Sequence, residues 1–109
     1  MKKKVLFLLI TLFSGFTTIQ AQTYFGGQNV INIYTEGANS VYASDIDGDG
    51  DIDMLSASSG DNKIAWYEND GNQNFAAHTI AVDADGAKSV YASDIDGDGD
   101  IDVLSASEN

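Results

Sequence analysis

Beyond an apolar N-terminal stretch, the chain alternates between short apolar segments and polar turns. The apolar segments cover residues 41–43, 52–57, 63–68 and 75–82. They are rich in β-branched and aromatic residues, which is typical of strands. The turns between them carry Gly, Asn and Asp, including an Asp-Gly pair at Asp70-Gly71. No window outside the N-terminal stretch keeps a helical period, so the pattern predicts an all-β fold.

A long internal repeat organises these segments. Residues 40–58 and 89–107 have the same sequence except that Met54 is replaced by Val103, and the offset between the copies is 49 residues. Self-similarity at such a period marks a solenoid, a propeller or an array of stacked units. About four short strands per period is typical of a β-propeller blade, so we expect propeller-like blades of antiparallel strands.

The chain contains just under two periods, in residues 22–109. Repeat arrays generally need at least about three units to bury a core. We therefore expect an incomplete propeller fragment, truncated relative to a longer protein. The alternative is a complete miniature domain that dimerises.

Residues 1–21 have the pattern of a secretory signal peptide. Three lysines, at positions 2–4, precede an apolar stretch over residues 5–16, and the segment ends at the small residue Ala21. The apolar stretch is too short to span a hydrocarbon core about 30 Å thick. We expect a signal-peptide helix that is removed on secretion, with no membrane insertion afterwards and a secreted or cell-surface location.

Removal of this segment makes the chain strongly acidic. All 17 acidic residues follow Ala21, whereas Lys63 and Lys88 are the only Lys or Arg residues that remain, so the net charge changes from −12 to −15. Such a charge repels nucleic acid and anionic membranes and favours cations. The chain has no cysteine, so no disulfide can stabilise it.

Two segments, loop 1 (residues 45–53) and loop 2 (residues 94–102), carry an aspartate at every second position. Calcium takes six to eight oxygen ligands, and in the familiar 12-residue loop positions 1, 3 and 5 supply side-chain oxygens while position 6 is glycine. A register that starts at Asp45 puts Gly50 at position 6, whereas a start at Asp47 would put Ile52 there. The sequence therefore predicts two calcium sites with ligands Asp45, Asp47, Asp49, Asp51 and Asp53, and Asp94, Asp96, Asp98, Asp100 and Asp102, and with Gly50 and Gly99 as turn glycines.

Within each predicted site, Asp51 and Asp100 would donate a backbone carbonyl, and Asp53 and Asp102 would close the cage at position 9. Position 12 is serine and a strand follows, so the loops are not EF-hands. Magnesium fits less well because it demands octahedral geometry. The alternative is a solvated acidic turn, but two carboxylates ~5 Å apart repel by roughly 3 kcal/mol at an effective dielectric near 20, and a solvated turn gains nothing from such crowding.

These motifs resemble the FG-GAP/VCBS repeat family, the repeats of integrin α-chain propellers and of many secreted bacterial proteins. The resemblance rests on SVYASD, on the loop D-x-D-x-D-G-x-x-D that continues into DMLSAS or DVLSAS, and on KIAWYENDGNQNF. It covers residues 25–109 and implies a propeller with calcium bound between neighbouring strands of a blade. The Phe-Gly-Gly of residues 25–27 is complete, whereas Phe75-Ala76-Ala77 departs from it.

Other residue types that could carry chemistry are better explained by packing. His78 has no cysteine or second histidine with which to share a metal. Trp66 and Tyr67 could contact a carbohydrate, but as neighbours on a strand they face opposite sides, so at least one packs in the interior. The repeated carboxylates suit structural ligands rather than an active site, and we expect no enzyme activity.

The sequence therefore predicts a secreted calcium-binding scaffold for binding or adhesion, with a protein or carbohydrate ligand at the cell surface. The alternative is a non-catalytic propeller module of a larger secreted carbohydrate-active enzyme. A third possibility is a structural surface array without a specific ligand.

Overall fold

The computed structural model describes residues 27–32 and 34–108, so the predicted signal peptide lies outside the described residues. Six strands make up the fold, and the described residues contain no helix, so none could cross a membrane. The strands are β1 (Ala38–Ser44), β2 (Asp53–Ser58), β3 (Lys63–Asn69), β4 (Phe75–Ala81), β5 (Ala87–Ser93) and β6 (Asp102–Ser107). The predicted all-β class is confirmed.

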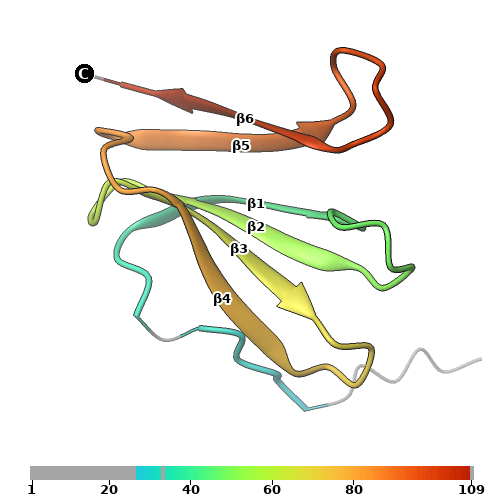
Figure 1. Cartoon of the computed structure of the whole chain (residues 1–109). Helices are drawn as coiled ribbons and strands as arrows, with labels where there is room; N and C mark the ends of the chain where they lie inside the picture. Colours follow the sequence, from blue (N-terminus) through green and yellow to red (C-terminus); the bar gives the residue numbers. More distant parts are fainter. Residues whose placement is uncertain (1–26, 33, 109) are drawn as a thin grey trace, which may run out of the picture.

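The first four strands form one antiparallel sheet in the order β1-β2-β3-β4, and β5 and β6 form a second sheet (Figure 1). Each strand of the first sheet pairs with its neighbour in sequence, as expected for one propeller-like blade. The predicted turns join them: Asn62 and Gly71 adopt positive φ of 53° and 76°. The second sheet repeats the β1–β2 pairing 49 residues later.

The two faces of the first sheet have different neighbours. Tyr42, Leu55 and Trp66 lie side by side across three strands and face the second sheet. Tyr67 points to the opposite face, where its hydroxyl lies 3.3 Å from Ser56 Oγ. This alternation is the period of two that a strand imposes on its side chains.

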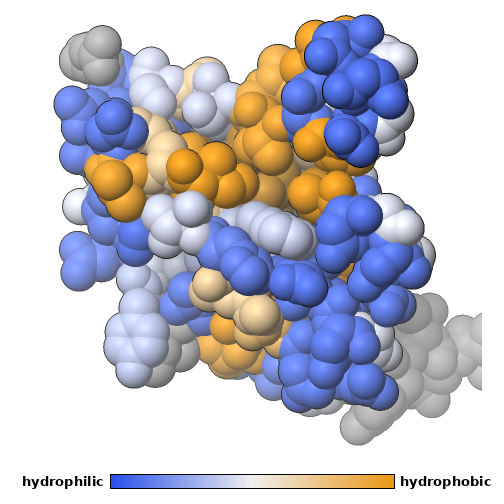
Figure 2. All heavy atoms as spheres, in the orientation of Figure 1, coloured by the Kyte–Doolittle hydropathy of each residue, from blue (hydrophilic) through white to orange (hydrophobic). Residues whose placement is uncertain are grey.

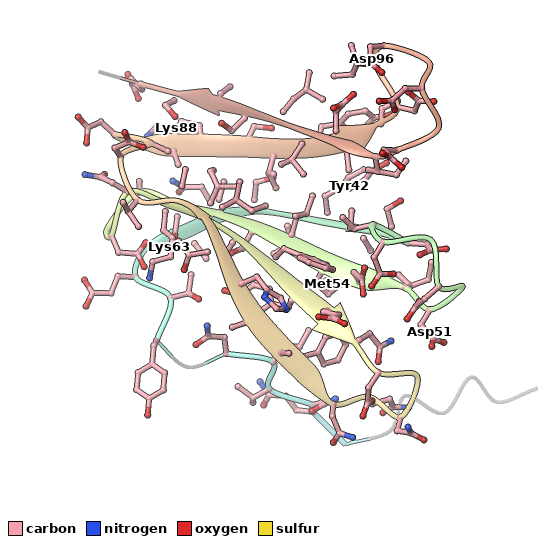
Figure 3. The ribbon with its side chains drawn as sticks, viewed as in Figure 1. Tyr42, Asp51, Met54, Lys63, Lys88 and Asp96 are labelled. Carbon is pink, nitrogen blue, oxygen red and sulfur yellow. The ribbon has the colours of Figure 1, made fainter. Side chains whose placement is uncertain are left out.

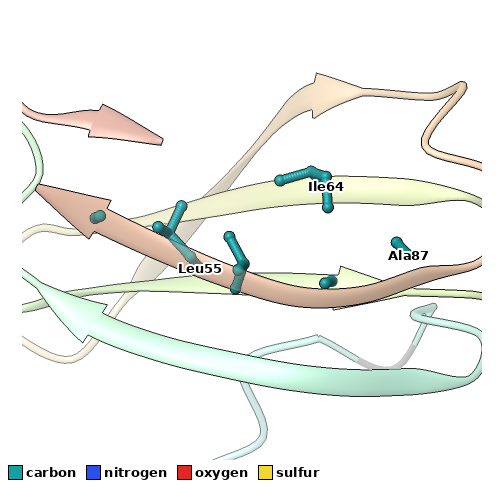
Figure 4. Packing of buried hydrophobic residues seen from close by; sticks show 6 residues of the cluster. Leu55, Ile64 and Ala87 are labelled. Atoms are coloured by element: carbon teal, nitrogen blue, oxygen red, sulfur yellow. The ribbon is translucent and has the colours of Figure 1, made fainter. Parts of the chain in front are cut away.

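The hydrophobic core lies between the two sheets, where β5 crosses β1 and β2 (Figure 4). Leu55, Ala57 and Ile64 from the first sheet pack against three residues of β5, Ala87, Val90 and Ala92, and all six are buried. Full burial of Leu55 or Ile64 contributes about 2 kcal/mol each. Figure 2 shows hydrophobic residues gathered between the sheets and hydrophilic residues at the loop ends.

A β-bulge aligns the core residues of β5. Ala87 and Val90 are three positions apart, so regular alternation would put them on opposite faces of the strand. The pairing with β6 shifts register between Ala87 and Ser89, and this extra residue returns both side chains to the buried face. The same shift occurs in β1 between Ala38 and Ser40, so the repeat preserves the irregularity.

Candidate metal centre

Loops 1 and 2 are the connections of two equivalent hairpins. Loop 1 joins β1 to β2 and loop 2 joins β5 to β6, and both lie on the same side of the molecule (Figure 1). A cavity of about 200 Å³ separates them and is lined by Ile46, Asp47, Gly48, Gly99, Asp100 and Ile101. The stacking of the two sheets therefore brings the two predicted sites next to each other.

Backbone N–H groups orient the carboxylates of loop 1. Asp45 accepts hydrogen bonds from the N–H groups of Gly48 (2.8 Å) and Gly50 (3.1 Å). Asp47 accepts from Asp49 N–H at 3.1 Å, and Asp49 accepts from Asp51 N–H at 2.8 Å. Loop 2 repeats these bonds from Gly97 (2.7 Å) and Gly99 (3.0 Å) to Asp94, from Asp98 (3.2 Å) to Asp96, and from Asp100 (2.9 Å) to Asp98.

The turn glycines have the backbone conformation that this wrapping requires. Gly50 and Gly99 adopt φ of 98° and 99°, and Gly48 and Gly97 adopt 79° and 78°. Residues with a Cβ rarely adopt these values. A β-branched residue would be strained at the position of Gly50. This supports the register in which Asp45 is position 1 and Gly50 is position 6.

Three carboxylates converge in each loop. One oxygen each of Asp45, Asp47 and Asp49 lies within 4.8 Å of the other two, and in loop 2 the same holds for Asp94, Asp96 and Asp102. Desolvation raises the pKa of Asp47, and repulsion from Asp49, Asp53 and Glu68 raises it further against the opposing hydrogen bond from Asp49 N–H. These clusters have the oxygen-only chemistry that suits a hard cation.

Asp53, which is predicted to close the cage at position 9, lies outside the converging group of loop 1. It is 0% exposed, and its two oxygens accept hydrogen bonds from the N–H groups of Ile46 (3.1 Å) and Asn69 (2.8 Å). Asp53 therefore ties loop 1 to the end of β3. Its counterpart Asp102 accepts from Ile95 N–H at 3.0 Å, is exposed, and belongs to the carboxylate group of loop 2.

Asp51 and Asp98 are predicted ligands whose carboxylates do not belong to the two converging groups. The Asp51 side chain packs against the β3–β4 turn, where a Cβ added to Gly71 would lie 2.5 Å from Asp51 Oδ2. This leaves the Asp51 carbonyl as the atom for the predicted ligand role. Asp98 accepts the bond from Asp100 N–H but is not part of the group that Asp94, Asp96 and Asp102 form.

The lysines are remote from both loops. Lys63 and Lys88 lie at the opposite end of the strands from Asp51 and Asp96 (Figure 3). Lys63 pairs with Asp61 at 2.9 Å and Lys88 with Glu108 at 3.2 Å. In residues 27–32 and 34–108, no salt bridge involves an aspartate of either loop. The negative charge of the loops thus has no cationic side chain to balance it there.

A comparison with protein-family models identifies a family to which the chain is similar. Residues 45–105 match the model described as FG-GAP-like repeat. The chain belongs to the FG-GAP-like repeat family. The match begins at Asp45 and ends at Ser105, so it includes both aspartate loops of this FG-GAP-like chain. Searches of curated proteins and of solved structures gave no match.

The aromatic residues of this FG-GAP-like repeat occupy different surroundings. Tyr67 is buried, and its hydroxyl lies 3.2 Å from Asn32 Nδ2 and 3.1 Å from Thr35 Oγ1, so its ring packs within the fold. Trp66 is half-buried and stacks on His78 with a centroid distance of 4.7 Å. His78 lies 2.7 Å from Glu68. One face of the Trp66 ring is thus covered by a side chain of this FG-GAP-like chain.

The aspartate pattern in the sequence does not indicate that Asn69 contacts loop 1. It lies outside both loops, yet its N–H reaches Asp53 and its Nδ2 donates to the Ile52 carbonyl at 3.0 Å. The signal in the sequence is weak, because Asn69 sits in a turn-rich stretch where asparagine is common.

Proposed function

We propose that this chain is a calcium-binding β-propeller-type module that serves as an extracellular scaffold for binding or adhesion. The observation that carries the proposal is the convergence of Asp45, Asp47 and Asp49 on a loop whose N–H groups hold them in place. Without a cation, this arrangement holds like charges together, and bound calcium turns that repulsion into attraction.

Calcium would bind at one site per loop, held by the carboxylates of the group and by the carbonyl of the residue at position 7. In loop 1 these residues are Asp45, Asp47 and Asp49, with the Asp51 carbonyl. In loop 2 they are Asp94, Asp96 and Asp102, with the Asp100 carbonyl. The metal would cross-link the two strands that each loop joins, β1 to β2 and β5 to β6.

The metal has a structural role in this proposal, and the segment carries no catalytic activity. The carboxylate pattern is duplicated in two loops, as expected for parts that hold a repeat together. The ligand of the scaffold would be a protein or a carbohydrate at the cell surface, and the N-terminal signal peptide would direct the chain out of the cell.

Titration calorimetry on the chain from Gln22 onward tests the metal sites. We expect two calcium ions per chain and much weaker binding of magnesium, because the loops offer a flexible oxygen cage. The matched variants Asp45→Asn and Asp94→Asn should each remove one site and leave the other. Absence of calcium heat, or equal affinity for magnesium, would exclude the proposed centres.

A glycan array probed with the labelled chain tests the carbohydrate branch of the scaffold role, and immobilised extracellular-matrix proteins test the protein branch. Binding should occur in calcium and decrease in EDTA. A chain that binds calcium but neither type of surface would retain the metal centre and lose the scaffold role.

A further inference from the structure

Tyr42 and Tyr91 form a direct contact between the two sheets. Their ring centroids lie 4.7 Å apart, with an angle of 53° between the ring planes. Tyr42 belongs to β1 and lies on the side of that strand toward β5, which carries Tyr91 (Figure 3). The two residues are 49 positions apart, which is the period of the repeat, so the contact joins equivalent side chains of successive units.

The phenol ends of the two rings are close together. The interaction with the Tyr91 hydroxyl raises the pKa of Tyr42, and burial raises it further. Tyr42 therefore stays protonated at neutral pH, and its oxidation must release a proton as well as an electron. The carbons ortho to each hydroxyl are next to these ends, so they are the ring atoms that a bond between the two tyrosines would join.

Both rings are in contact with solvent. Tyr91 is exposed, and Tyr42 is half-buried although the second sheet packs on its side of β1. The position that these tyrosines share in the repeat therefore keeps solvent access beneath a covering sheet. An oxidant in solution can reach it there.

The other tyrosines in residues 27–32 and 34–108 have different surroundings. The Tyr67 ring lies on the opposite face of the first sheet, where its hydroxyl is 3.1 Å from Thr35 Oγ1. Tyr34 is 80% exposed. Within these ranges, Tyr42 and Tyr91 are the one pair of tyrosines whose rings are in contact. The arrangement thus selects these two phenols for a reaction with each other.

We propose that Tyr42 and Tyr91 are a site of oxidative cross-linking, at which a haem peroxidase and hydrogen peroxide join the two rings as dityrosine. The chain has no cysteine, so a carbon–carbon bond between tyrosines offers a covalent link that a disulfide cannot supply. The link would connect β1 to β5. Like a disulfide, it would stabilise the fold mainly by restricting the unfolded chain.

The reaction balances with one molecule of peroxide. Each phenol loses one electron and one proton to the haem peroxidase, and the two electrons and two protons reduce hydrogen peroxide to two water molecules. Each phenoxyl radical carries spin density on the carbons ortho to its oxygen. Two such carbons, one from each ring, form the new bond, and the hydrogen on each carbon then moves to the phenol oxygen. Both rings regain their hydroxyl groups, and the chain has lost two hydrogen atoms.

The cross-link and the calcium sites can be tested separately. Neither tyrosine lies in loop 1 or loop 2, and neither is a predicted metal ligand. Failure of the cross-link would leave calcium binding intact. Calorimetry that showed no calcium binding would leave the ring contact intact.

Peroxidase treatment of the chain from Gln22 onward, in dilute solution with calcium present, tests the site. Dityrosine fluorescence should appear in a product that migrates as a monomer on a denaturing gel and has lost the mass of two hydrogen atoms. Trypsin cleaves after Lys63 and Lys88, so it separates Tyr42 from Tyr91. Mass spectrometry of the digest should therefore find residues 22–63 joined to residues 89–109.

Phenylalanine variants identify the residues that react. Tyr42→Phe and Tyr91→Phe keep a ring for packing but lack the phenol, and each should lose the joined peptide. Tyr34→Phe is the matched control, because Tyr34 lies in the same tryptic peptide as Tyr42, and its yield should equal that of the wild type. Circular dichroism checks that each variant keeps its strands.

Three results would overturn the proposal. The first is a wild type that forms no dityrosine under these conditions. The second is dityrosine only in products that migrate as dimers, which would indicate collisions between chains. The third is a joined peptide that persists in Tyr42→Phe, since another tyrosine would then have reacted with Tyr91.

Discussion

Loops 1 and 2 have the same sequence from Asp45 to Asp53 and from Asp94 to Asp102, yet their last aspartates differ in surroundings. Asp53 is fully buried between Ile46 and Asn69, whereas Asp102 is exposed and accepts a bond from its own loop. The difference arises from β3, which flanks loop 1 and has no counterpart beside loop 2 in the described residues. Two loops of identical sequence can thus place their aspartates differently, because the neighbouring strand β3 holds Asp53 through the Asn69 N–H.

The largest expected difference between the loops concerns Asp53→Asn and Asp102→Asn. Asn keeps one acceptor oxygen, so one buried N–H beside residue 53 would lose its partner, at a cost of about 2 kcal/mol. The exposed Asp102 side chain should cost less than about 1 kcal/mol. Urea unfolding in EDTA measures both free energies of unfolding, and equal losses would contradict the anchoring role of Asp53.

The second comparison concerns position 5 of each loop. Asp49 belongs to the converging group of loop 1, whereas Asp98 lies outside that of loop 2. Asp49→Ala should weaken calcium binding about tenfold, or ~1.4 kcal/mol, as expected for loss of a charge-assisted ligand. Asp98→Ala should have a smaller effect on its own site. Calorimetry of each variant would contradict this account if Asp98→Ala had the larger effect.

Asn69→Ala tests the link between β3 and loop 1 at a residue outside both loops. It removes the bond from Asn69 Nδ2 to the Ile52 carbonyl at 3.0 Å but keeps the N–H that reaches Asp53. Loss of one such bond should cost about 1 kcal/mol and lower the calcium affinity of loop 1 a few-fold. Loop 2 serves as the internal control, since its affinity should not change.

The smallest expected effect lies at the opposite end of the strands. A hydrogen bond from Ser58, followed by the ion pair with Lys63, lowers the pKa of Asp61. The folded state therefore favours ionised Asp61, and this stability is present above the ordinary carboxyl pKa and is lost as pH falls through the lowered value. Asp61→Asn should remove about 0.5 kcal/mol at neutral pH. Thermal melts at pH 7 and pH 2.5 should differ less for the variant than for the wild type.

The strands could be predicted from sequence because each is a short, largely apolar segment between turn residues. The predicted segment 52–57 corresponds to β2 with a shift of one residue, because Ile52 lies in the loop and is exposed. The convergence of Asp45 and Asp47 follows from loop spacing and the Gly50 turn. The two roles of Asp53 and Asp102 could not be predicted, because they depend on a strand that the local sequence does not encode.

The burial of Val90 and the exposure of Val41 have the same origin. Both residues occupy the same sequence, SVYAS, and no local rule distinguishes them. Only the stacking of β5 on β1 and β2 covers one of them. Periodicity predicts which face of a strand is apolar, but not which copy of that face has a partner.

We propose that calcium in the two loops stabilises this fold, and the melting temperature of the chain from Gln22 onward measures this stabilisation. A ligand that binds only the folded state at a hundredfold excess over Kd contributes roughly 2.7 kcal/mol per site. For a domain of this size, such a contribution should raise the melting temperature by about 10 °C or more in millimolar calcium relative to EDTA. High salt should reproduce only part of this increase, because screening supplies no coordination. Equal melting temperatures in EDTA and in calcium would contradict the claim.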